Sequence, residues 1–511
     1  MLGRFVRIPT TCISSVAFIL LMYIGGYAQK IYYSQPERDD SRNTAFEIIG
    51  KVGQHILVYK DNNGDEAISI YDNEMNPVNR VPLRFRYNLL NVDFINYPNQ
   101  FILIYQYQYR RYVYCYGMIM DENASIIGQP VLIDSTDVGF GNLKHKLYSV
   151  TYSDDKHRIL VYKINQNKEL TNIFYTFLLN DQLQLLNNSR VSLPMENRKD
   201  YLTGFSLDNE GNFVFVKVGK ANNKDLAADA WMVTKPAYED TFYTAAIPLN
   251  HRYIDEFKLK LDNDHHLSYA VSFFYDTRRN DVAGLCYVRY RYLDDSVDIV
   301  RFIPFDNNLK AAARNGAPRE DAFDDYFLRQ LILRSDGGFL ITAESFYSSS
   351  GYNPWNRWDY LYGPYTLYPY YDFYYTPFSP WFYSPFYRSM GYSRFHYNDI
   401  AVLSYDGTGK LEWSNFVRKD QYDDQTDDFL SYQLLNTGLA LHFLYNEPYR
   451  RSYILRDVTI TPDGKLNMQP TMRGLDRGYV FMPRYGKQIS ANETVIPCIY
   501  RNFVCFAKIQ F

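Results

Sequence analysis

Apolar, strand-like segments recur along this chain of 511 residues, and their spacing limits the fold more than any other feature. Each segment follows a turn signal, and most begin about 45 to 58 residues apart, the length of a four-stranded propeller blade with long loops. We therefore predict an all-β fold, a single β-propeller of seven or eight four-stranded blades. The segments are residues 56–59, 101–105, 159–162, 213–216, 267–271, 339–342, 439–443 and 494–496.

A second signal repeats within these units. A later strand runs into an acidic or Asn turn, after which we expect an outer strand. The clearest internal match pairs Asp324-Asp325-Tyr326 with Asp427-Asp428-Phe429, because Gln-Leu follows both at the same distance. The turns are Asp72-Asn73, Asp121-Glu122, Asn180-Asp181, Asp294-Asp295, Asp406-Gly407 and Asp463-Gly464.

Composition agrees with strands, because the chain has 51 tyrosines and 34 phenylalanines, both of which favour sheets. The best helix candidate is short, residues 309–313. Two other architectures stay open: an irregular array of β-sandwiches, and a membrane-spanning sheet suggested by the alternating residues 503–511. In a propeller that final strand would pair with residues 31–33 and close the ring, which leaves no open edge.

The first 28 residues have the pattern of a secretory signal peptide. Arg4 and Arg7 form a basic region, residues 12–25 are an apolar run, and residues 26–28 offer a small-residue cleavage site. The apolar run is shorter than the roughly 20 residues that a spanning helix needs, so we expect export and no transmembrane span after cleavage. An uncleaved anchor is the alternative. The net charge of −3 predicts no nucleic-acid partner.

We divide the chain accordingly. Residues 1–28 are the signal peptide, and residues 29–43 are an N-terminal segment that includes the ring-closing strand. Residues 44–511 are the propeller, and residues 346–397 are an aromatic-rich loop inserted in it. Nearly every second residue of this insertion is Tyr, Phe or Trp, and its prolines prevent regular structure.

The unit around the insertion carries a resemblance to a known group of proteins. Residues 334–338 are a turn followed by an apolar strand, and after the insertion a second strand leads to Asp406-Gly407 and Trp413. This pattern, over residues 320–419, resembles propeller-type repeats of exported Bacteroidota envelope proteins. The resemblance implies a fold and a location, the periplasm or outer envelope of a Gram-negative bacterium, and no activity.

The expected function is non-enzymatic. If each recurrent strand is the second of its blade, the insertion and several arginine pairs lie on one face, where aromatic rings with polar tips suit partner contact. We therefore expect an exported binding or scaffold protein that contacts a glycan polymer or an envelope protein through this face. The candidate binding residues are Trp355, Trp358, Trp381, Tyr370, Tyr374, Arg110, Arg278 and Arg450.

Two other functions stay as alternatives. One is a structural subunit of an envelope complex, and the other is a propeller-type glycan-active enzyme. The enzyme would use Asp324, Asp325, Asp427 or Asp428 as acid and base, since glycosidases need two carboxyls in a cleft. No catalytic, metal or cofactor motif is present, so we expect none of these sites; His265-His266 fits a solvated turn.

The mature chain would keep four cysteines, and two of them lie near its end. If Arg501-Asn502 is the turn of a hairpin, Cys498 lies directly opposite Cys505. Directly opposed residues are close enough for a disulfide, which an exported protein can form. The alternative is that both thiols pack as small apolar side chains.

Overall fold

The computed structural model describes residues 29–511 apart from 38, 142, 144–145, 167–169, 198–199, 221–226, 278–280, 351–392, 450–451 and 470–477. Within this part of the chain, no helix is long and apolar enough to cross a membrane. Nearly all regular structure consists of strands in antiparallel sheets. The prediction of an all-β protein is therefore confirmed.

Most sheets are built from four consecutive strands. The first sheet holds β2 (Thr44–Val52), β3 (His55–Asn62), β4 (Asp65–Tyr71) and β5 (Pro77–Pro82). The second holds β6 (Leu89–Asn96), β7 (Gln100–Tyr109), β8 (Tyr112–Asp121) and β9 (Ile126–Asp137). The third holds β10 (Ser149–Tyr152), β11 (Arg158–Gln166), β12 (Thr171–Asn180) and β13 (Leu185–Pro194).

Two further groups of strands share a nine-stranded sheet, in which β18 (Tyr253–Ile254) joins them. The first group is β14 (Tyr201–Leu207), β15 (Phe213–Lys220), β16 (Ala227–Lys235) and β17 (Tyr243–Ala246). The second is β19 (Lys258–Asp262), β20 (Leu267–Tyr275), β21 (Gly284–Arg291) and β22 (Ser296–Pro304).

Three sheets complete the chain. One holds β23 (Tyr326–Leu333), β24 (Phe339–Ser350), β25 (Ser393–Tyr405) and β26 (Leu411–Val417), with β27 (Gln421–Asp423) beside β25. The next holds β28 (Tyr432–Asn436), β29 (Leu441–Tyr449), β30 (Ser452–Ile460) and β31 (Leu466–Met468). The last holds β32 (Tyr479–Phe481), β33 (Lys487–Ser490), β34 (Glu493–Tyr500), β35 (Phe503–Gln510) and β1 (Lys30–Tyr33), with the 3-10 helix η3 (Pro483–Tyr485) before β33.

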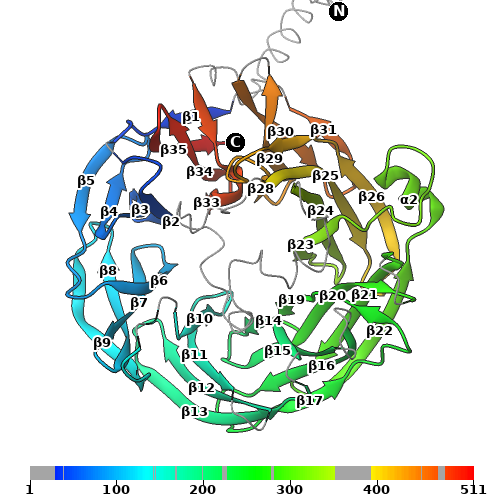
Figure 1. The fold of residues 1–511 in the computed structure, drawn as a ribbon, viewed down its shortest axis with the longest axis horizontal. Helices are drawn as coiled ribbons and strands as arrows, with labels where there is room; N and C mark the ends of the chain where they lie inside the picture. Colours follow the sequence, from blue (N-terminus) through cyan, green and yellow to red (C-terminus); the bar gives the residue numbers. More distant parts are fainter. Residues whose placement is uncertain are drawn as a thin grey trace, which may run out of the picture.

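The sheets follow one another around a central opening in chain order (Figure 1). In the groups from β2 to β31 the first strand lies nearest the opening and the last strand lies at the rim (Figure 1). In the last sheet β1 takes the outer position, beside β35. At the meeting point of the two ends, β1 pairs antiparallel with β35, and Ile31 lies opposite Ile509. This is the pairing anticipated for residues 31–33. It gives the outer edge of β35 a partner from the start of the chain.

The recurrent apolar segments occupy the second position in each sheet, counted from the strand nearest the opening. They fall in β3, β7, β11, β15, β20, β24, β29 and β34, with residues 439–440 just before β29. The acidic or Asn turns link third to fourth strands, and their side chains shape the turn. Asp406 accepts the backbone N–H of Thr408 and of Lys410, both at 2.9 Å. Because such turns need only local residues, the sequence was enough to find them.

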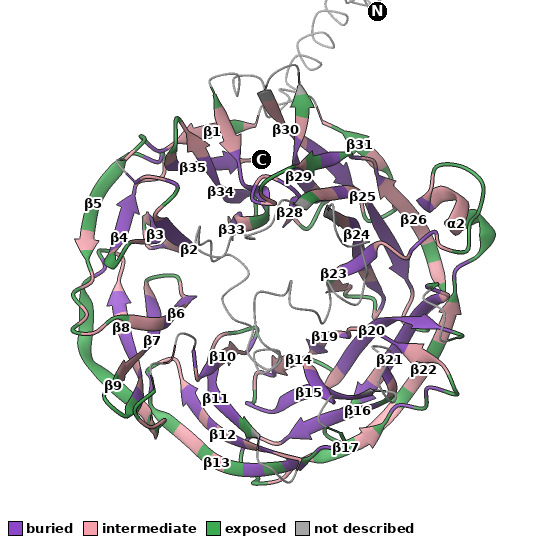
Figure 2. Cartoon of the chain, viewed as in Figure 1, coloured by how far each residue is buried: buried purple, intermediate pink, exposed green. Residues whose placement is uncertain are grey.

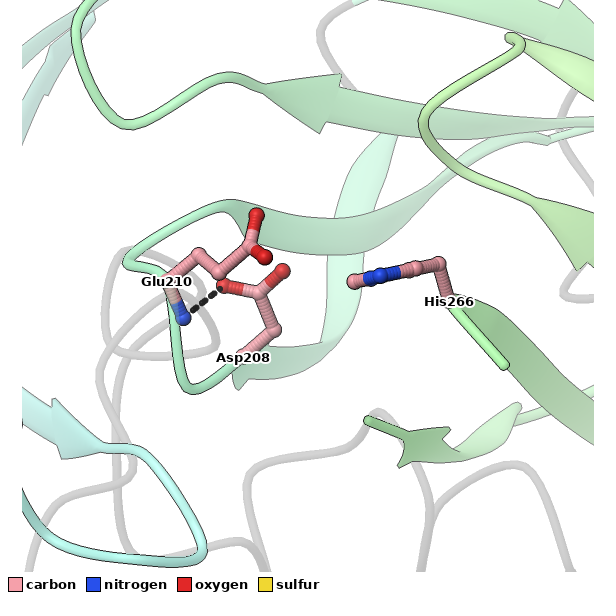
Figure 3. A group of neighbouring side chains, drawn as sticks. All are labelled: Asp208, Glu210 and His266. Atoms are coloured by element: carbon pink, nitrogen blue, oxygen red, sulfur yellow. Dashed lines mark hydrogen bonds between the residues drawn. The ribbon is translucent and has the colours of Figure 1, made fainter. Parts of the chain in front are cut away.

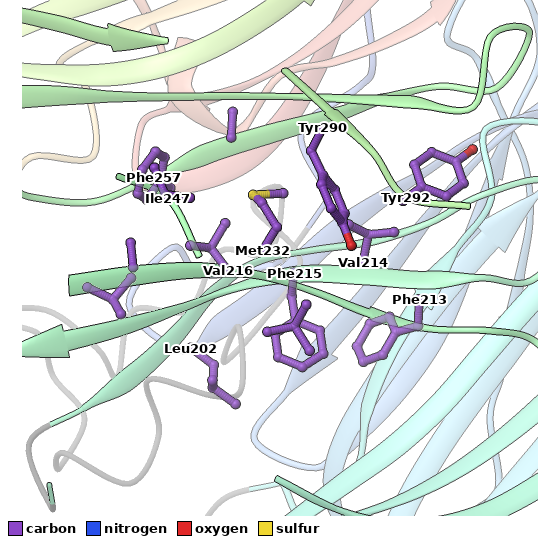
Figure 4. Packing of buried hydrophobic residues seen from close by; sticks show 14 of the residues in the cluster. Leu202, Phe213, Val214, Phe215, Val216, Met232, Ile247, Phe257, Tyr290 and Tyr292 are labelled. Carbon is purple, nitrogen blue, oxygen red and sulfur yellow. The ribbon is translucent and has the colours of Figure 1, made fainter. Parts of the chain in front are cut away.

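Burial follows the same order. The second and third strands are largely buried, while outer strands such as β5 and β9 are exposed over most of their length (Figure 2). The apolar core lies between neighbouring sheets, where Phe213 and Phe215 of β15 pack against Tyr162 and Phe174 of the third sheet. Val216 and Met232 lie on the other face of the sheet that holds β15 (Figure 4). Each buried ring of this kind stabilises the fold by about 1.5 to 3 kcal/mol.

The short helix α2 (Asn307–Ala313) contains the predicted residues 309–313, so that prediction is confirmed. The helix begins earlier than expected because Asp306 caps it. The Asp306 carboxylate accepts the backbone N–H of Leu309 at 2.8 Å. Such a cap satisfies a donor that the first turn would otherwise leave without a partner.

Candidate functional site

A polar cleft of about 870 Å³ lies where several first-to-second strand turns meet. We call it the polar cleft. It is bounded by the turn before β11, the β14–β15 turn, the β19–β20 turn and the β23–β24 turn, with Asp154, Asn209, Asn263 and Asp336 among its lining residues. Its volume lies in the range of ligand sites, about 300 to 1,000 Å³.

Three side chains with proton-transfer and metal-binding chemistry gather beside this cleft. Asp208 and Glu210 come from the β14–β15 turn and His266 from the β19–β20 turn, and one ligand atom of each lies within 4.8 Å of the others. Figure 3 shows both carboxylates facing the edge of the imidazole ring. Asp208 is buried, Glu210 is exposed and His266 is half-buried.

The carboxylate of Asp208 is committed to its own turn. Its Oδ1 accepts the backbone N–H groups of Glu210, Gly211 and Asn212, at 3.0, 2.7 and 2.6 Å. Its Oδ2 accepts the side-chain amide of Asn212 at 2.7 Å. This is the pattern of the capped turn at Asp406, with more donors.

The hydrogen bonds that Asp208 accepts bear on whether this group can hold a metal ion. Three of the four donors bond to Oδ1, whereas Oδ2 accepts one, so Asp208 keeps a position for one further partner. Asp208, Glu210 and His266 can therefore each offer one ligand atom to an ion, the number of protein ligands that catalytic metal sites keep. The chemistry of Glu210 and His266 is derived without an ion.

Tyr292, which follows β21, lies beside both His266 and Asp208. Its hydroxyl lies 3.5 Å from His266 Nδ1, and its ring meets the imidazole edge-on at 6.1 Å between centroids. Burial, and then the negative charge of Asp208, raise the pKa of Tyr292 far above its ordinary value. The phenol stays protonated and can keep its hydrogen bonds at any working pH.

Other charges around the polar cleft are paired within the chain. Lys260 lies 2.8 Å from Asp154, and Arg289 lies 2.6 Å from Asp298. Arg334 forms ion pairs with both Asp336 and Glu412. These pairs leave few unpaired charges on the lining of the cleft. Glu210 and His266 lie next in the chain to two lining residues, Asn209 and His265, and are not lining residues themselves.

Most of the predicted binding residues cannot be placed. Trp355, Trp358, Trp381, Tyr370, Tyr374, Arg278 and Arg450 lie outside the described residues. Arg110 is described, in the β7–β8 turn, where it is exposed and its guanidinium lies 5.2 Å from the ring centroid of Tyr109. Its neighbour Arg111 pairs with Asp137 at 2.5 Å. The two arginines of this pair therefore have different surroundings.

The aspartate pairs that were considered as acid and base hold the structure instead. The Asp325 carboxylate accepts hydrogen bonds from both terminal nitrogens of the Arg314 guanidinium, Nη2 at 2.9 Å and Nη1 at 3.2 Å. Asp427 pairs with Arg484 and accepts the hydroxyl of Tyr397 at 2.9 Å. Burial raises the pKa of Asp427, but Arg484 and Tyr397 outweigh it and hold the pKa below its ordinary value.

The same holds for their neighbours. Asp324 accepts the backbone N–H of Val282 at 2.9 Å, and Asp428 is buried. An acid–base pair needs one carboxyl that can hold a proton and an open cleft between the two. Since each of these carboxylates is engaged by the protein, the enzyme alternative cannot use them as the sequence suggested.

The hairpin of the last two strands has the predicted register. Cys498 of β34 lies directly opposite Cys505 of β35. Both are buried free thiols in this structure. Burial raises the pKa of Cys505 to about 12, so the thiol is protonated and unreactive as a nucleophile at neutral pH.

No family model and no curated protein matches the sequence. Among solved structures, the chain is similar to polysaccharide lyase Uly1, with a TM-score of 0.38 and 9% identity over 82% of this chain and 89% of that one. A prolyl endopeptidase matches with a TM-score of 0.34 and 8% identity, over 84% of this chain and 56% of its own. The Synechocystis apocarotenoid oxygenase matches with a TM-score of 0.35 and 8% identity, over 95% and 94%.

These scores and identities are too low to assign an activity or a site residue to this chain. The names of the three proteins are those of enzymes, and none of the comparisons supports the prediction of a non-enzymatic binding or scaffold protein, which is not retained.

The sequence analysis missed Glu210 and assigned His266 to a solvated turn. One signal was present, because Asp208-Asn209-Glu210-Gly211 and Asp262 to His266 both precede recurrent apolar strands. Turns that occupy the same place in neighbouring repeats end on the same side of the sheets. Comparing them across repeats would have brought the two side chains together.

Proposed function

We propose that this chain is a glycan-active enzyme that works in the polar cleft. The observation that carries the proposal is the pair of Glu210 and His266, whose carboxylate and imidazole ligand atoms lie within 4.8 Å of each other. A carboxylate and an imidazole that are open to solvent are the groups most used in general acid–base catalysis. The lining amides and carboxylates of the cleft supply donors and acceptors that suit a substrate rich in hydroxyl groups.

Groups within 4.8 Å of each other act on the same face of a sugar, which suits cleavage of a glycosidic bond by elimination at a uronate. Glu210 accepts the proton from the carbon next to the carboxylate, and the electrons of that carbon–hydrogen bond form a carbon–carbon double bond. His266 donates a proton to the leaving glycosidic oxygen as the carbon–oxygen bond breaks. Asp208 shapes the turn that carries Glu210, and Tyr292 orients the imidazole.

We also infer how the chain is organised around this site. Seven sheets, of which the nine-stranded one holds two groups, give eight blades of one propeller, with β1 closing the last blade. The sequence pattern of residues 1–28 supports export, with cleavage after Ala28, to the periplasm or outer envelope of a Gram-negative bacterium. Mass spectrometry of the mature protein is expected to find Gln29 as its first residue, and an intact Met1 would contradict export by cleavage.

The test of the proposed function is release of reducing ends from xylan, pectin and alginate by the mature chain, residues 29–511. We expect turnover of at least one polymer, and loss of turnover in Glu210→Gln and His266→Gln. Glu239→Gln and His251→Gln make the same changes at exposed positions away from the cleft and serve as controls. The proposal fails if no polymer is cleaved, or if the cleft variants match their controls.

A further inference from the structure

A second cavity lies on the opposite side of the ring from β23–β28, between the first two sheets. It has a volume of about 670 Å³. One wall is the link from β5 to β6, and the other is the outer part of β7 and β8. We call this cavity the tyrosine groove, and the rings that line it are Tyr87, Tyr105, Tyr107, Tyr109, Tyr114 and Tyr116.

The rings form one continuous ladder. Tyr107 of β7 stacks with Tyr114 and Tyr116 of β8, at 5.5 and 6.0 Å between centroids. Tyr87 of the link stacks with Tyr107 at 5.2 Å and with Tyr109 at 4.6 Å. This wall is regular because side chains two residues apart on a strand share one face.

Most of these rings are not fully buried in the core. Tyr87, Tyr107, Tyr114 and Tyr116 are half-buried, and 36% of Tyr109 is exposed. A half-buried aromatic wall offers large, rigid contact area that loses little conformational freedom on binding. The C–H faces of sugar rings can pack on such a wall, and the phenol hydroxyls can bond their oxygens.

The charge around the groove is positive and uncompensated. Arg84 and Arg86 line it, and Arg110 stacks on Tyr109 at its end. All three are exposed, and within the described residues none of the three has an ion pair, whereas Arg80 and Arg111 nearby pair with Asp65 and Asp137. Among the described residues that line the groove there is no acidic side chain.

We propose that the tyrosine groove binds a uronate-containing polysaccharide, whose sugar rings stack on the tyrosines and whose carboxylates pair with Arg84 and Arg86. A planar guanidinium matches a carboxylate in two parallel hydrogen bonds, which favours a carboxylate over a group without that geometry. The groove is a site distinct from the polar cleft. Its binding does not depend on the proposed reaction there.

The experiment measures binding of the mature chain to polygalacturonate, dextran sulfate and neutral dextran by affinity electrophoresis. We expect retardation by polygalacturonate, with weaker retardation by dextran sulfate and none by dextran. The Arg84→Gln/Arg86→Gln double variant should lose about tenfold in affinity, and Tyr87→Ala/Tyr109→Ala a similar amount. Circular dichroism confirms that each variant is folded.

Matched controls decide the interpretation. Arg80→Gln/Arg111→Gln removes the same charge from paired arginines, and Tyr238→Ala removes an exposed ring elsewhere; both should bind as the parent does. Glu210→Gln should also bind normally, so failure of the proposed catalysis and failure of the groove are separable. The proposal is overturned by absent polygalacturonate binding, by equal binding of dextran or dextran sulfate, or by equal losses in the control variants.

Discussion

The polar cleft is lined by turns between first and second strands, and the tyrosine groove by the link from β5 to β6 together with β7 and β8. The two regions differ in how their charges are balanced. In the cleft, Lys260, Arg289 and Arg334 each have a carboxylate partner. In the groove, Arg84 and Arg86 have none within the described residues. Paired charges fix the positions of neighbouring groups, while unpaired surface charges stay available to a ligand. The difference suggests that the cleft is organised for chemistry and the groove for attachment.

The largest expected effect is on turnover, which a variant beside the polar cleft should lower and a variant in the tyrosine groove should not. Glu210→Gln removes a proton acceptor, so we expect turnover to fall by about 10² to 10⁴-fold while polygalacturonate affinity stays unchanged. The Arg84→Gln/Arg86→Gln variant should do the reverse, with turnover of a short oligosaccharide preserved. Steady-state kinetics and affinity electrophoresis on the same preparations make the comparison. If either variant lowers both quantities, the regions act as one site.

The next effect is on the free energy of unfolding, through the β14–β15 turn beside the cleft. Asp208→Ala leaves several donors of the β14–β15 turn without an acceptor, so we expect the free energy of unfolding to fall by about 2 to 4 kcal/mol. Asp208→Asn is the matched control, because its amide oxygen can still accept the backbone N–H groups. Urea denaturation measures both. An Asp208→Ala protein as stable as the parent would show that the turn does not depend on this carboxylate.

Ionic strength should act on the groove. Since Arg84 and Arg86 are exposed, salt screens their attraction for a polyanion, and we expect affinity for polygalacturonate to fall about tenfold between about 0.05 and 0.5 M salt. The slope should flatten in the Arg84→Gln/Arg86→Gln variant and stay in Arg80→Gln/Arg111→Gln. Binding that is independent of salt would mean that the guanidinium groups do not contact the polymer.

A smaller expected effect is on the free energy of unfolding, which should differ between a paired and an unpaired arginine. Arg334 has two carboxylate partners and only 25% of its side chain is exposed, so Arg334→Gln should cost about 1 kcal/mol of unfolding free energy. Arg86→Gln removes an unpaired, exposed cation and should change stability by no more than about 0.5 kcal/mol. Thermal and urea unfolding compare the two. Equal losses would remove the distinction between paired and unpaired charges.

The smallest expected effect is that the affinity for polygalacturonate stays constant as the pH rises. Burial, and then the neighbouring Tyr116, raise the pKa of Tyr107 to about 12. The phenol therefore stays neutral where an ordinary tyrosine, with a pKa of about 10, would gain a negative charge and repel an anionic polymer. We expect no change in polygalacturonate affinity between about pH 7 and pH 9.5 that depends on Tyr107. A decrease in that range that disappears in Tyr107→Phe would contradict the raised pKa.

Local patterns were enough to find the strands. The recurrent apolar segments fall in second strands, the acidic turns link third to fourth strands, and Cys498 lies opposite Cys505 as the hairpin register requires. Each of these follows from side-chain alternation and turn chemistry over a few residues. The aspartate pairs misled the sequence analysis because Asp325 pairs with Arg314 and Asp427 pairs with Arg484, contacts that no motif in the sequence indicates.

The sequence also contains a pattern that is typical of the tyrosine groove and that our sequence analysis did not use. Arg84, Arg86 and Tyr87 precede β6, and tyrosines alternate through Tyr105-Gln106-Tyr107 and Tyr114-Cys115-Tyr116. The alternation shows that these rings share one face of a hairpin. It does not show that the link from the preceding sheet covers that face incompletely, which leaves the cavity.

The sequence by itself determined the strand-rich class, the repeat length, the turns and the register of the final hairpin, because these depend on contacts close along the chain. Only the tertiary structure decided which turns meet. Glu210 and His266 belong to different groups of strands, and their approach depends on how β14–β15 and β19–β20 pack around the opening. Chemistry at such places depends on three-dimensional packing, which no local pattern encodes.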